Sequence, residues 1–222
     1  KIVKGIKMKK RALIILSIIL LLTGCRSKLS GQLEMPKVGD DIVEMEIEDY
    51  GVVKFKLVTE TPKITGLFKE YYDKGEYDHM NVAGNYPNRA IHLLDLSRDV
   101  IYRDLHKESI ENGKKYECIR GSVLFLRDRE GKGHLQYLAF ILNEEEPIEH
   151  IERNQQIYGF SDDIKKMYEK YKGISDSHGN LPVIGQVYEG IEILDKVNSE
   201  VTLDGYEEGP KIIRFELKKY TD

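Results

Sequence analysis

The stretch at residues 182–197, PVIGQVYEGIEILDKV, constrains the fold of this chain more than any other part of the sequence. Its first half is rich in β-forming residues, and Gly185 stands among them as an expected bulge or point of close approach. Its second half repeats Ile191, Leu194 and Val197 at helical spacing, after a Glu-Gly pair. The stretch therefore predicts a strand that passes directly into a short helix.

A second patterned region starts near Ile42, where apolar and charged residues alternate on both sides of a turn at 49–51. This period of two predicts a β-hairpin with one apolar and one wet face. Acidic residues on its first arm would face lysines on its second, and each such pair contributes roughly 0.2–1 kcal/mol. Thr61 and Pro62 then open a predicted helix that continues to about Tyr72.

Weaker patterns fill most of the remaining chain. Strands are expected over 116–126, over 135–142 and after Pro210. The last strand is expected to turn its apolar side chains inward, namely Ile213, Phe215 and Leu217. Residues 82–91 are interpreted as a loop or weak strand, and 97–112 as containing a short helix.

Residues 144–173 are predicted to be an inserted pair of helices. Pro147 starts the first helix and Ser161 caps the second, which has acidic residues in its first turn and lysines before Gly173, as the helix dipole favours. The apolar stripe of this second helix consists of Ile164, Met167, Tyr168 and Tyr171. A stripe at this spacing indicates packing against the domain more strongly than a partner-binding helix.

Two of these regions resemble one known family. Residues 182–197 are similar to the signature near the end of cyclophilin-type peptidyl-prolyl isomerases, V-F-G-x-V-x-x-G-h-x-h-h-D-x-h, where h is apolar. The matching residues are Val183, Gly185, Val187, Gly190, Asp195 and Val197, with Ile184 in place of the Phe. Residues 50–78 resemble the first third of the same family, through Gly51, Leu57, Pro62, Phe68, Gly75, Tyr77 and Asp78.

The resemblance implies a mainly β fold: a closed antiparallel cyclophilin-like β-barrel of about eight strands, capped by helices. The barrel domain would span 42–222 and carry 144–173 as an extra helical insertion. The resemblance also implies peptidyl-prolyl cis-trans isomerase activity. Rotation about an X-Pro bond faces a barrier of about 18–20 kcal/mol. It needs an apolar pocket, hydrogen-bond donors and a cation near the prolyl nitrogen, but no cofactor and no metal.

Aligned to the family, the chain departs from its functional pattern. Gly84 falls where the family has its arginine, Leu181 where it has a histidine, and Asp176 at an aromatic position, so the catalytic residues stay unassigned. Arg89 or Arg98 remains open as a displaced cation. The expected substrate-binding residues are Gln136, Tyr137, Leu138, His92 and Phe125. Because loss of one preorganised donor typically lowers a rate about 10²–10³-fold, we expect isomerase activity to be weak or absent.

The N-terminus carries an export pattern. A basic stretch at 1–11 precedes an apolar run at 12–22, which is short for a membrane span and suits a signal-peptide core. The following Thr-Gly-Cys resembles the lipobox of bacterial lipoproteins. We therefore predict a signal peptide over 1–25, removed before Cys25, which would then carry a lipid. The alternative is a short membrane anchor with a chance cysteine. Residues 26–41 are interpreted as a tether.

The composition of the chain argues against two further classes of function, nucleic-acid binding and metal binding. The formal net charge is −4 with basic residues scattered along the chain, which argues against a nucleic-acid partner. The six histidines show no metal-ligand spacing, so no metal site is predicted.

Two hypotheses remain for an extracytoplasmic protein anchored to the bacterial cell membrane through a lipid on Cys25. One is an isomerase that assists folding of exported clients at proline-containing segments. The other is a non-catalytic, chaperone-like module that binds peptides or proteins. A solute-binding lipoprotein is disfavoured because the chain is short for two lobes.

Overall fold

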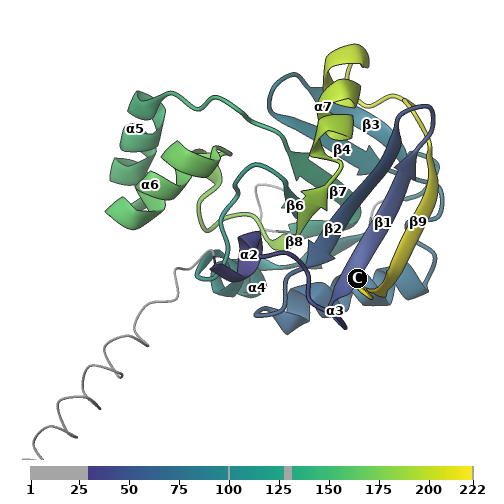
Figure 1. Ribbon diagram of the computed structural model, residues 1–222, viewed down its shortest axis with the longest axis horizontal. Helices are drawn as coiled ribbons and strands as arrows, with labels where there is room; N and C mark the ends of the chain where they lie inside the picture. Colours follow the sequence, from purple (N-terminus) through teal and green to yellow (C-terminus); the bar gives the residue numbers. More distant parts are fainter. Residues whose placement is uncertain (1–29, 100, 128–131, 222) are drawn as a thin grey trace, which may run out of the picture.

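The computed structural model describes residues 30–99, 101–127 and 132–221, so the predicted signal peptide and Cys25 lie outside the described residues. Within them, one antiparallel sheet runs in the order β3-β4-β7-β6-β8-β2-β1-β9, and β5 pairs with β7 beside this path (Figure 1). The strands are β1 (Asp41–Ile47), β2 (Gly51–Leu57), β3 (Asn81–Tyr86), β4 (Ala90–Leu94), β5 (Tyr102–Asp104), β6 (Ser122–Arg127), β7 (Lys132–Ile141), β8 (Val183–Glu189) and β9 (Ile212–Lys219).

The two edges of this sheet meet at one end. Asn81 at the start of β3 forms an isolated antiparallel bridge with Lys211, directly before β9. The amide of Val82 donates to the carbonyl of Pro210 at 2.9 Å, and the amide of Ile212 donates to the carbonyl of Met80 at 2.9 Å. The sheet therefore curls into the predicted eight-strand antiparallel barrel.

Aromatic side chains fill the interior of this barrel. The ring of Phe55 on β2 lies 6.3 Å from that of Phe68, 5.7 Å from that of Phe140 and 6.4 Å from that of Phe215. Gly185 on β8 sits against the same ring, because a Cβ atom there would lie 2.7 Å from Cδ2 of Phe55. The glycine predicted as a point of close approach thus has that role.

Helices cover the ends of the barrel. The predicted first helix is α3 (Pro62–Asp73), and the helix after the 182–189 strand is α7 (Ile191–Glu200). Figure 1 shows these two helices at opposite ends of the barrel. The short helix expected within 97–112 is α4 (His106–Gly113). It occupies only the second half of that region, because β5 comes before it. In the part of the chain that the structure describes, no helix is long and apolar enough to cross a membrane.

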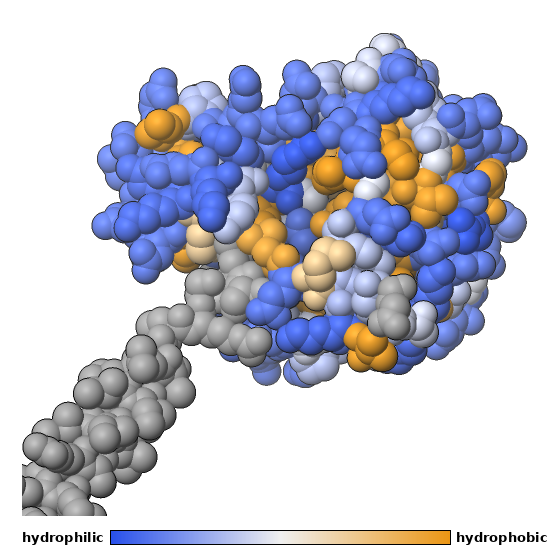
Figure 2. All heavy atoms as spheres, in the orientation of Figure 1, coloured by the Kyte–Doolittle hydropathy of each residue, from blue (hydrophilic) through white to orange (hydrophobic). Residues whose placement is uncertain are grey.

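The predicted helical insertion is present as α5 (Ile148–Tyr158) and α6 (Asp162–Tyr171), which form a lobe beside the barrel (Figure 1). The Ser161 side chain caps α6 by accepting from the amide of Ile164. The apolar stripe of α6 packs around Tyr168 against Ile119, Ile151 and Phe160. Packing is therefore confirmed for this stripe, and the outer surface of the lobe is mostly hydrophilic on the face shown in Figure 2.

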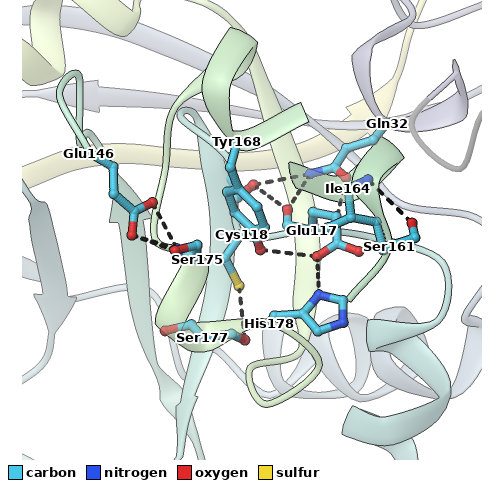
Figure 3. Close-up of polar contacts among 11 residues, drawn as sticks. Gln32, Glu117, Cys118, Glu146, Ser161, Ile164, Tyr168, Ser175, Ser177 and His178 are labelled. Carbon is cyan, nitrogen blue, oxygen red and sulfur yellow. Dashed lines mark hydrogen bonds and ion pairs between the residues drawn. The ribbon is translucent and has the colours of Figure 1, made fainter. Parts of the chain in front are cut away.

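A buried polar network fastens the lobe and the N-terminal segment to the barrel (Figure 3). The fully buried carboxylate of Glu117 accepts from the Tyr168 hydroxyl at 3.0 Å and lies 2.7 Å from Nδ1 of His178. The carbonyl of Glu117 accepts from the side chain of Gln32 at 2.9 Å, and Nε2 of Gln32 also donates to the Ser122 hydroxyl. Glu117 thus holds both the helical lobe and the N-terminal segment against the barrel.

Part of the segment predicted as a tether packs on the barrel. It contains the short helix α2 (Ser30–Leu33), in which the Gln32 side chain is fully buried. The Lys56 ammonium donates to the carbonyl of Gly31 at 2.6 Å and to that of Glu34. Pro36 is also buried. The described residues from 30 to 41 are therefore held in place and do not hang free.

Three local predictions differ from the structure. The strand expected from 116 begins only at Ser122, because side chains and loops bond the backbone of 116–121 in place of a neighbouring strand. The region 82–91 forms the β3–β4 hairpin. Ile213 points outward and is 56% exposed, because the β1–β9 register shifts at Ile47 and leaves this residue without a partner. Phe215 and Leu217 pack against the core as expected.

Two glycines with the same backbone angle allow a test of the barrel's close contacts. Gly190 and Gly205 both have φ of 85°, but a Cβ at Gly190 would lie 2.5 Å from the carbonyl oxygen of Val52, whereas nothing lies within 4 Å at Gly205. We expect Gly205→Ala to lower the free energy of unfolding by about 1 kcal/mol, the cost of a left-handed alanine. Gly190→Ala should lower the free energy of unfolding by a further ~1–3 kcal/mol, because the backbone of β2 must shift to make room for the methyl group. Urea unfolding of the chain from residue 26 onward measures both values, and equal losses would contradict this account of Gly190.

Candidate functional site

The outer face of β3, β4 and β7 carries the candidate site, and strand alternation decides which residues reach it. On β4, Ile91 and Leu93 point into the barrel core. Their neighbours Ala90, His92 and Leu94 therefore point to the opposite face. His92 is 8% exposed, so the outer face of β4 is itself covered.

The cover is a group of rings that we call the tyrosine–histidine cluster. Its members are Tyr86, His92, Tyr102, His134, Tyr137 and Tyr206. The centre of the His92 ring lies 4.6 Å from that of Tyr86 and 5.1 Å from that of Tyr137. The Tyr137 hydroxyl lies 2.8 Å from Nδ1 of His92, and Tyr206 packs against Tyr137 at 5.7 Å. Residues from four strands and from the loop before β9 thus share one surface.

The floor of the cluster is buried and neutral. Burial lowers the pKa of His92 to about 4, so its imidazole is uncharged at neutral pH. Burial also raises the pKa of Tyr137, and a hydrogen bond to Tyr206 together with burial raises the pKa of Tyr86. The cluster therefore offers aromatic faces and hydroxyl groups, with no charge on its histidine floor. In the described ranges, no group of three or more His, Cys, Asp or Glu side chains is placed to hold a metal ion.

The rim of the cluster is open to solvent. Tyr86 is 44% exposed, Tyr102 is 51% exposed and Tyr206 is 51% exposed, whereas Tyr137 is 4% exposed. Large rings exposed beside a buried floor are a surface suited to apolar and proline-rich segments, because such segments dock between aromatic side chains.

Gly84 occupies the position that the resemblance assigns to the family's arginine. It lies on β3 opposite His92. A Cβ atom at Gly84 would lie 3.2 Å from Cε1 of Tyr206 and 3.3 Å from Cβ of His92. A side chain at this position would therefore start in tight contact with two members of the cluster.

The two arginines left open as displaced cations are both paired with carboxylates. Nη1 of Arg98 lies 3.0 Å from Glu76, and Nε lies 3.0 Å from the buried carboxylate of Asp95. Gln136 is bound to the same Glu76, since its Nε2 donates to Oε2 at 2.7 Å. Arg89 pairs with Asp176 at 3.3 Å, and both side chains are about half exposed.

The predicted substrate-binding residues divide into two groups. Tyr137 and His92 belong to the tyrosine–histidine cluster and contact each other. Gln136 is buried beside it, and its Oε1 accepts from the amide of Ile101 at 2.8 Å. Phe125 and Leu138 correct the expectation, because both are fully buried in the barrel core and neither reaches the outer surface. Their strands turn these positions inward.

The position aligned with the family's histidine is also apart from the cluster. Leu181 packs beside a separate apolar group that includes Leu124 and Ala139. Asp176, at the aromatic position, is engaged with Arg89. Neither residue supplies an aromatic or basic group to the site.

Sequence reasoning missed Tyr86, Tyr102 and Tyr206. Tyr206 follows an Asp-Gly pair in the loop 201–211, a pattern that indicates only a turn. Its place in the cluster comes from the loop's path along β3, where the amide of Glu207 donates to the carbonyl of Ala83 at 3.2 Å. The abundance of tyrosine, 14 in this chain, was the one available signal.

Comparisons with known proteins bear on the fold. Neither protein-family models nor curated protein sequences give a match to this chain. Among solved structures, the chain is similar to a Cryptosporidium parvum cyclophilin-type peptidyl-prolyl cis-trans isomerase, with a TM-score of 0.54 and 14% identity over 82% of this chain and 99% of that one. The structure of that protein in the presence of the dipeptide Ala-Pro matches at a TM-score of 0.53, with the same identity and coverage. The chain therefore has a cyclophilin-like fold.

The burial of His92 predicts a dependence of stability on pH. The folded-state pKa is about 4 and the unfolded value about 6.5, so stability from the neutral imidazole is complete above pH ~6.5 and is lost as the pH falls towards 4. The shift corresponds to about 2–4 kcal/mol in total. His92→Gln replaces the imidazole beside Tyr137 by an amide that does not titrate, so its unfolding free energy should fall less than that of the parent between pH 6.5 and 4. Urea unfolding across this range, with the exposed His106→Gln as control, checks the difference; parallel curves for parent and His92→Gln would contradict it.

Proposed function

We propose that this chain is an exported, lipid-anchored binding module that holds proline-containing segments of exported proteins on the tyrosine–histidine cluster, with isomerase activity weak or absent. One observation carries the proposal. At Gly84, where the family's arginine would stand, there is no side chain, and a Cβ atom there would already be in tight contact with Tyr206 and His92. The site therefore keeps its aromatic surface, and Gly84 supplies no cation to it.

The chemistry of isomerisation supports the non-catalytic form. A positive charge directed at the prolyl nitrogen lowers the barrier because it takes the nitrogen lone pair out of amide resonance. Arg98 is held between Glu76 and Asp95, and Arg89 faces Asp176. Either guanidinium would have to leave a carboxylate partner to meet a peptide, which lessens its electrostatic effect.

The exposed rings support binding of proline. Proline rings and the extended backbone around them are already rigid, so they dock on aromatic side chains with little loss of conformational entropy. Tyr86 and Tyr206 present such rings at the rim, above the neutral pair of His92 and Tyr137. The similar Cryptosporidium protein was solved in the presence of Ala-Pro, which suggests the kind of peptide to test first.

Export and anchoring are supported by the N-terminal sequence. A basic stretch, an apolar run of 11 residues and Thr-Gly-Cys precede the described part of the chain in the order that lipoprotein export requires. A lipid on Cys25 would hold the barrel at the outer side of the cell membrane, where exported chains emerge unfolded. Proline-containing segments of those chains would be the partners.

A slow isomerase is the second candidate function, and the cyclophilin-like fold favours it. In that case Gln136 and Arg98 would act together, since both contact Glu76. A proline-isomerisation assay on an Ala-Pro tetrapeptide separates the candidates. The binding module predicts a rate equal to the blank, and a rate above the blank that disappears in Arg98→Ala would establish the isomerase.

The rim tyrosines are expected to carry peptide affinity. A stacked aromatic pair contributes about 0.5–1.5 kcal/mol beyond area burial, so Tyr86→Ala and Tyr206→Ala should each weaken binding of an Ala-Pro tetrapeptide about three- to tenfold. Isothermal titration measures this. Tyr158→Ala on α5 removes a tyrosine that is 40% exposed on the helical lobe and serves as the matched control. Equal affinities for Ala-Pro and Ala-Ala peptides, or equal effects of all three substitutions, would contradict the proposed site.

The two cysteines of the chain provide a matched test of the anchor. Cys25 is the predicted lipid acceptor, whereas Cys118 is buried in the barrel domain. When the full chain is expressed in a bacterium fed a labelled fatty acid, Cys118→Ser should keep the label and Cys25→Ser should lose it completely. A labelled Cys25→Ser chain, or an unlabelled parent chain, would rule out lipid attachment at this residue.

A further inference from the structure

The segment that leads into the barrel presents apolar side chains to solvent. Leu33 is 37% exposed, Met35 is 59% exposed and Val38 is 71% exposed. These residues lie within six positions of one another in a short stretch of chain. Isolated exposed apolar residues are ordinary, but three large ones on one short segment call for a covering surface.

The structure fixes the direction in which this segment faces. Gln32, directly before Leu33, and Pro36, between Met35 and Val38, are both buried. Gln32 is bound to Glu117, Ser122 and Gln186, and Lys56 bonds the carbonyls of Gly31 and Glu34. At its other end, the amide of Gly39 donates to the carbonyl of Tyr220 at 2.9 Å. The segment is therefore fastened along its length, and its apolar side chains are held outward.

The chain also limits how far this segment lies from Cys25. Ser30, where the described part of the chain starts, is five positions after Cys25. A fully extended chain covers at most ~3.6 Å per residue, so the two Cα atoms are no more than about 18 Å apart. A lipid on Cys25 would place that residue at the membrane interface, and the interface itself is about 5–8 Å deep on each side. Ser30 would consequently lie within about 18 Å of the interface, so the exposed segment that follows it can reach the bilayer.

We propose that residues 33–38 form a membrane-docking collar, in which Leu33, Met35 and Val38 enter the interface of the bilayer that holds the lipid on Cys25. This inference rests on the lipid anchor of the proposed function. Lys37 pairs with Glu34 at 3.2 Å, so the collar carries little net charge. Its attachment to the bilayer therefore depends on apolar burial and is insensitive to salt, unlike binding by a basic patch.

The absence of tryptophan from this chain makes the collar directly testable. Met35→Trp and Val38→Trp each introduce a single fluorophore at an exposed position. Ile213→Trp is the matched control, because Ile213 is 56% exposed and lies near the Ile47 end of the β1–β9 pair. The collar leads into the Asp41 end, which is about 20 Å away at 3.4 Å per residue.

Each variant is produced as the full chain in a bacterium, purified with its lipid and reconstituted into phosphatidylcholine vesicles. Half of the vesicles contain lipid brominated near the glycerol end of the acyl chains. We expect the collar tryptophans to shift their emission to the blue and to lose most of their intensity in brominated vesicles, at low and at high salt. The Ile213→Trp emission should be the same in both kinds of vesicle.

The other outcomes are distinct from one another. A lipid-modified chain whose collar tryptophans match Ile213→Trp would overturn the docking collar and leave the anchor intact. A chain without lipid would overturn the anchor and the collar together. A blue shift that grows with protein concentration in detergent, without quenching in vesicles, would assign the segment to contact between two copies and overturn the membrane proposal.

Discussion

The contact between Gly185 and the ring of Phe55 is the constraint on which the rest of the barrel depends. A Cβ at Gly185 would lie 2.7 Å from both the ring and the carbonyl oxygen of Lys56, so only glycine lets β8 approach β2 at this point. Phe55 in turn contacts Phe68 and Phe140, and each such ring pair contributes about 0.5–1.5 kcal/mol beyond its buried area. The aromatic core and the close passage of the two strands therefore require each other.

The packing of the barrel core determines which side chains of β4 and β7 lie on the outer face of the sheet. Because Ile91 and Leu93 point into the barrel, His92 between them must point outward. On β7 the register with β6 jumps from Leu138 to His134, so residues 135–137 have no partner on β6. This irregularity lets Leu135 and Leu138 both enter the core, while Tyr137 turns to the outer face of the sheet and is buried there beneath the rim tyrosines. The tyrosine–histidine cluster is thus built on strands whose orientation is fixed from inside.

The sequence predicted the parts of the fold that depend on neighbouring residues. The alternation before and after Asp49 gave β1 and β2, and the Ser161 cap gave α6, because those signals lie within the element they specify. The outward side of Ile213 could not be predicted, since it depends on a register shift against a strand about 170 residues earlier. The irregular path of 116–121 depends likewise on Gln32, which bonds Glu117 across a separation of 85 residues.

The sequence likewise predicted some residues of the candidate site and missed others. Motif alignment reached His92, Tyr137 and Gly84, because strand residues keep a fixed count from the motifs that flank them. It did not reach Tyr206, which contacts all three positions, because Tyr206 comes from a loop whose length and path no local pattern sets. It also assigned Phe125 and Leu138 to substrate binding, although Leu138 follows Tyr137 directly on the strand and so points to the opposite face, into the core with Phe125.

The tyrosine–histidine cluster, which is the proposed peptide-binding surface, and the N-terminal segment, which would lead to the lipid anchor, lie on different parts of the barrel. In Figure 1 the β3–β4 hairpin, which carries His92, lies well apart from α2, where the N-terminal segment meets the barrel. Gln32 ties that segment to the chain around Glu117, and Glu117 also holds Tyr168 of the helical lobe. The orientation of the barrel relative to its N-terminal attachment is consequently set by buried hydrogen bonds. An anchor at that attachment would leave the rings of Tyr86 and Tyr206 open to an arriving chain, and binding would then need no movement of the barrel.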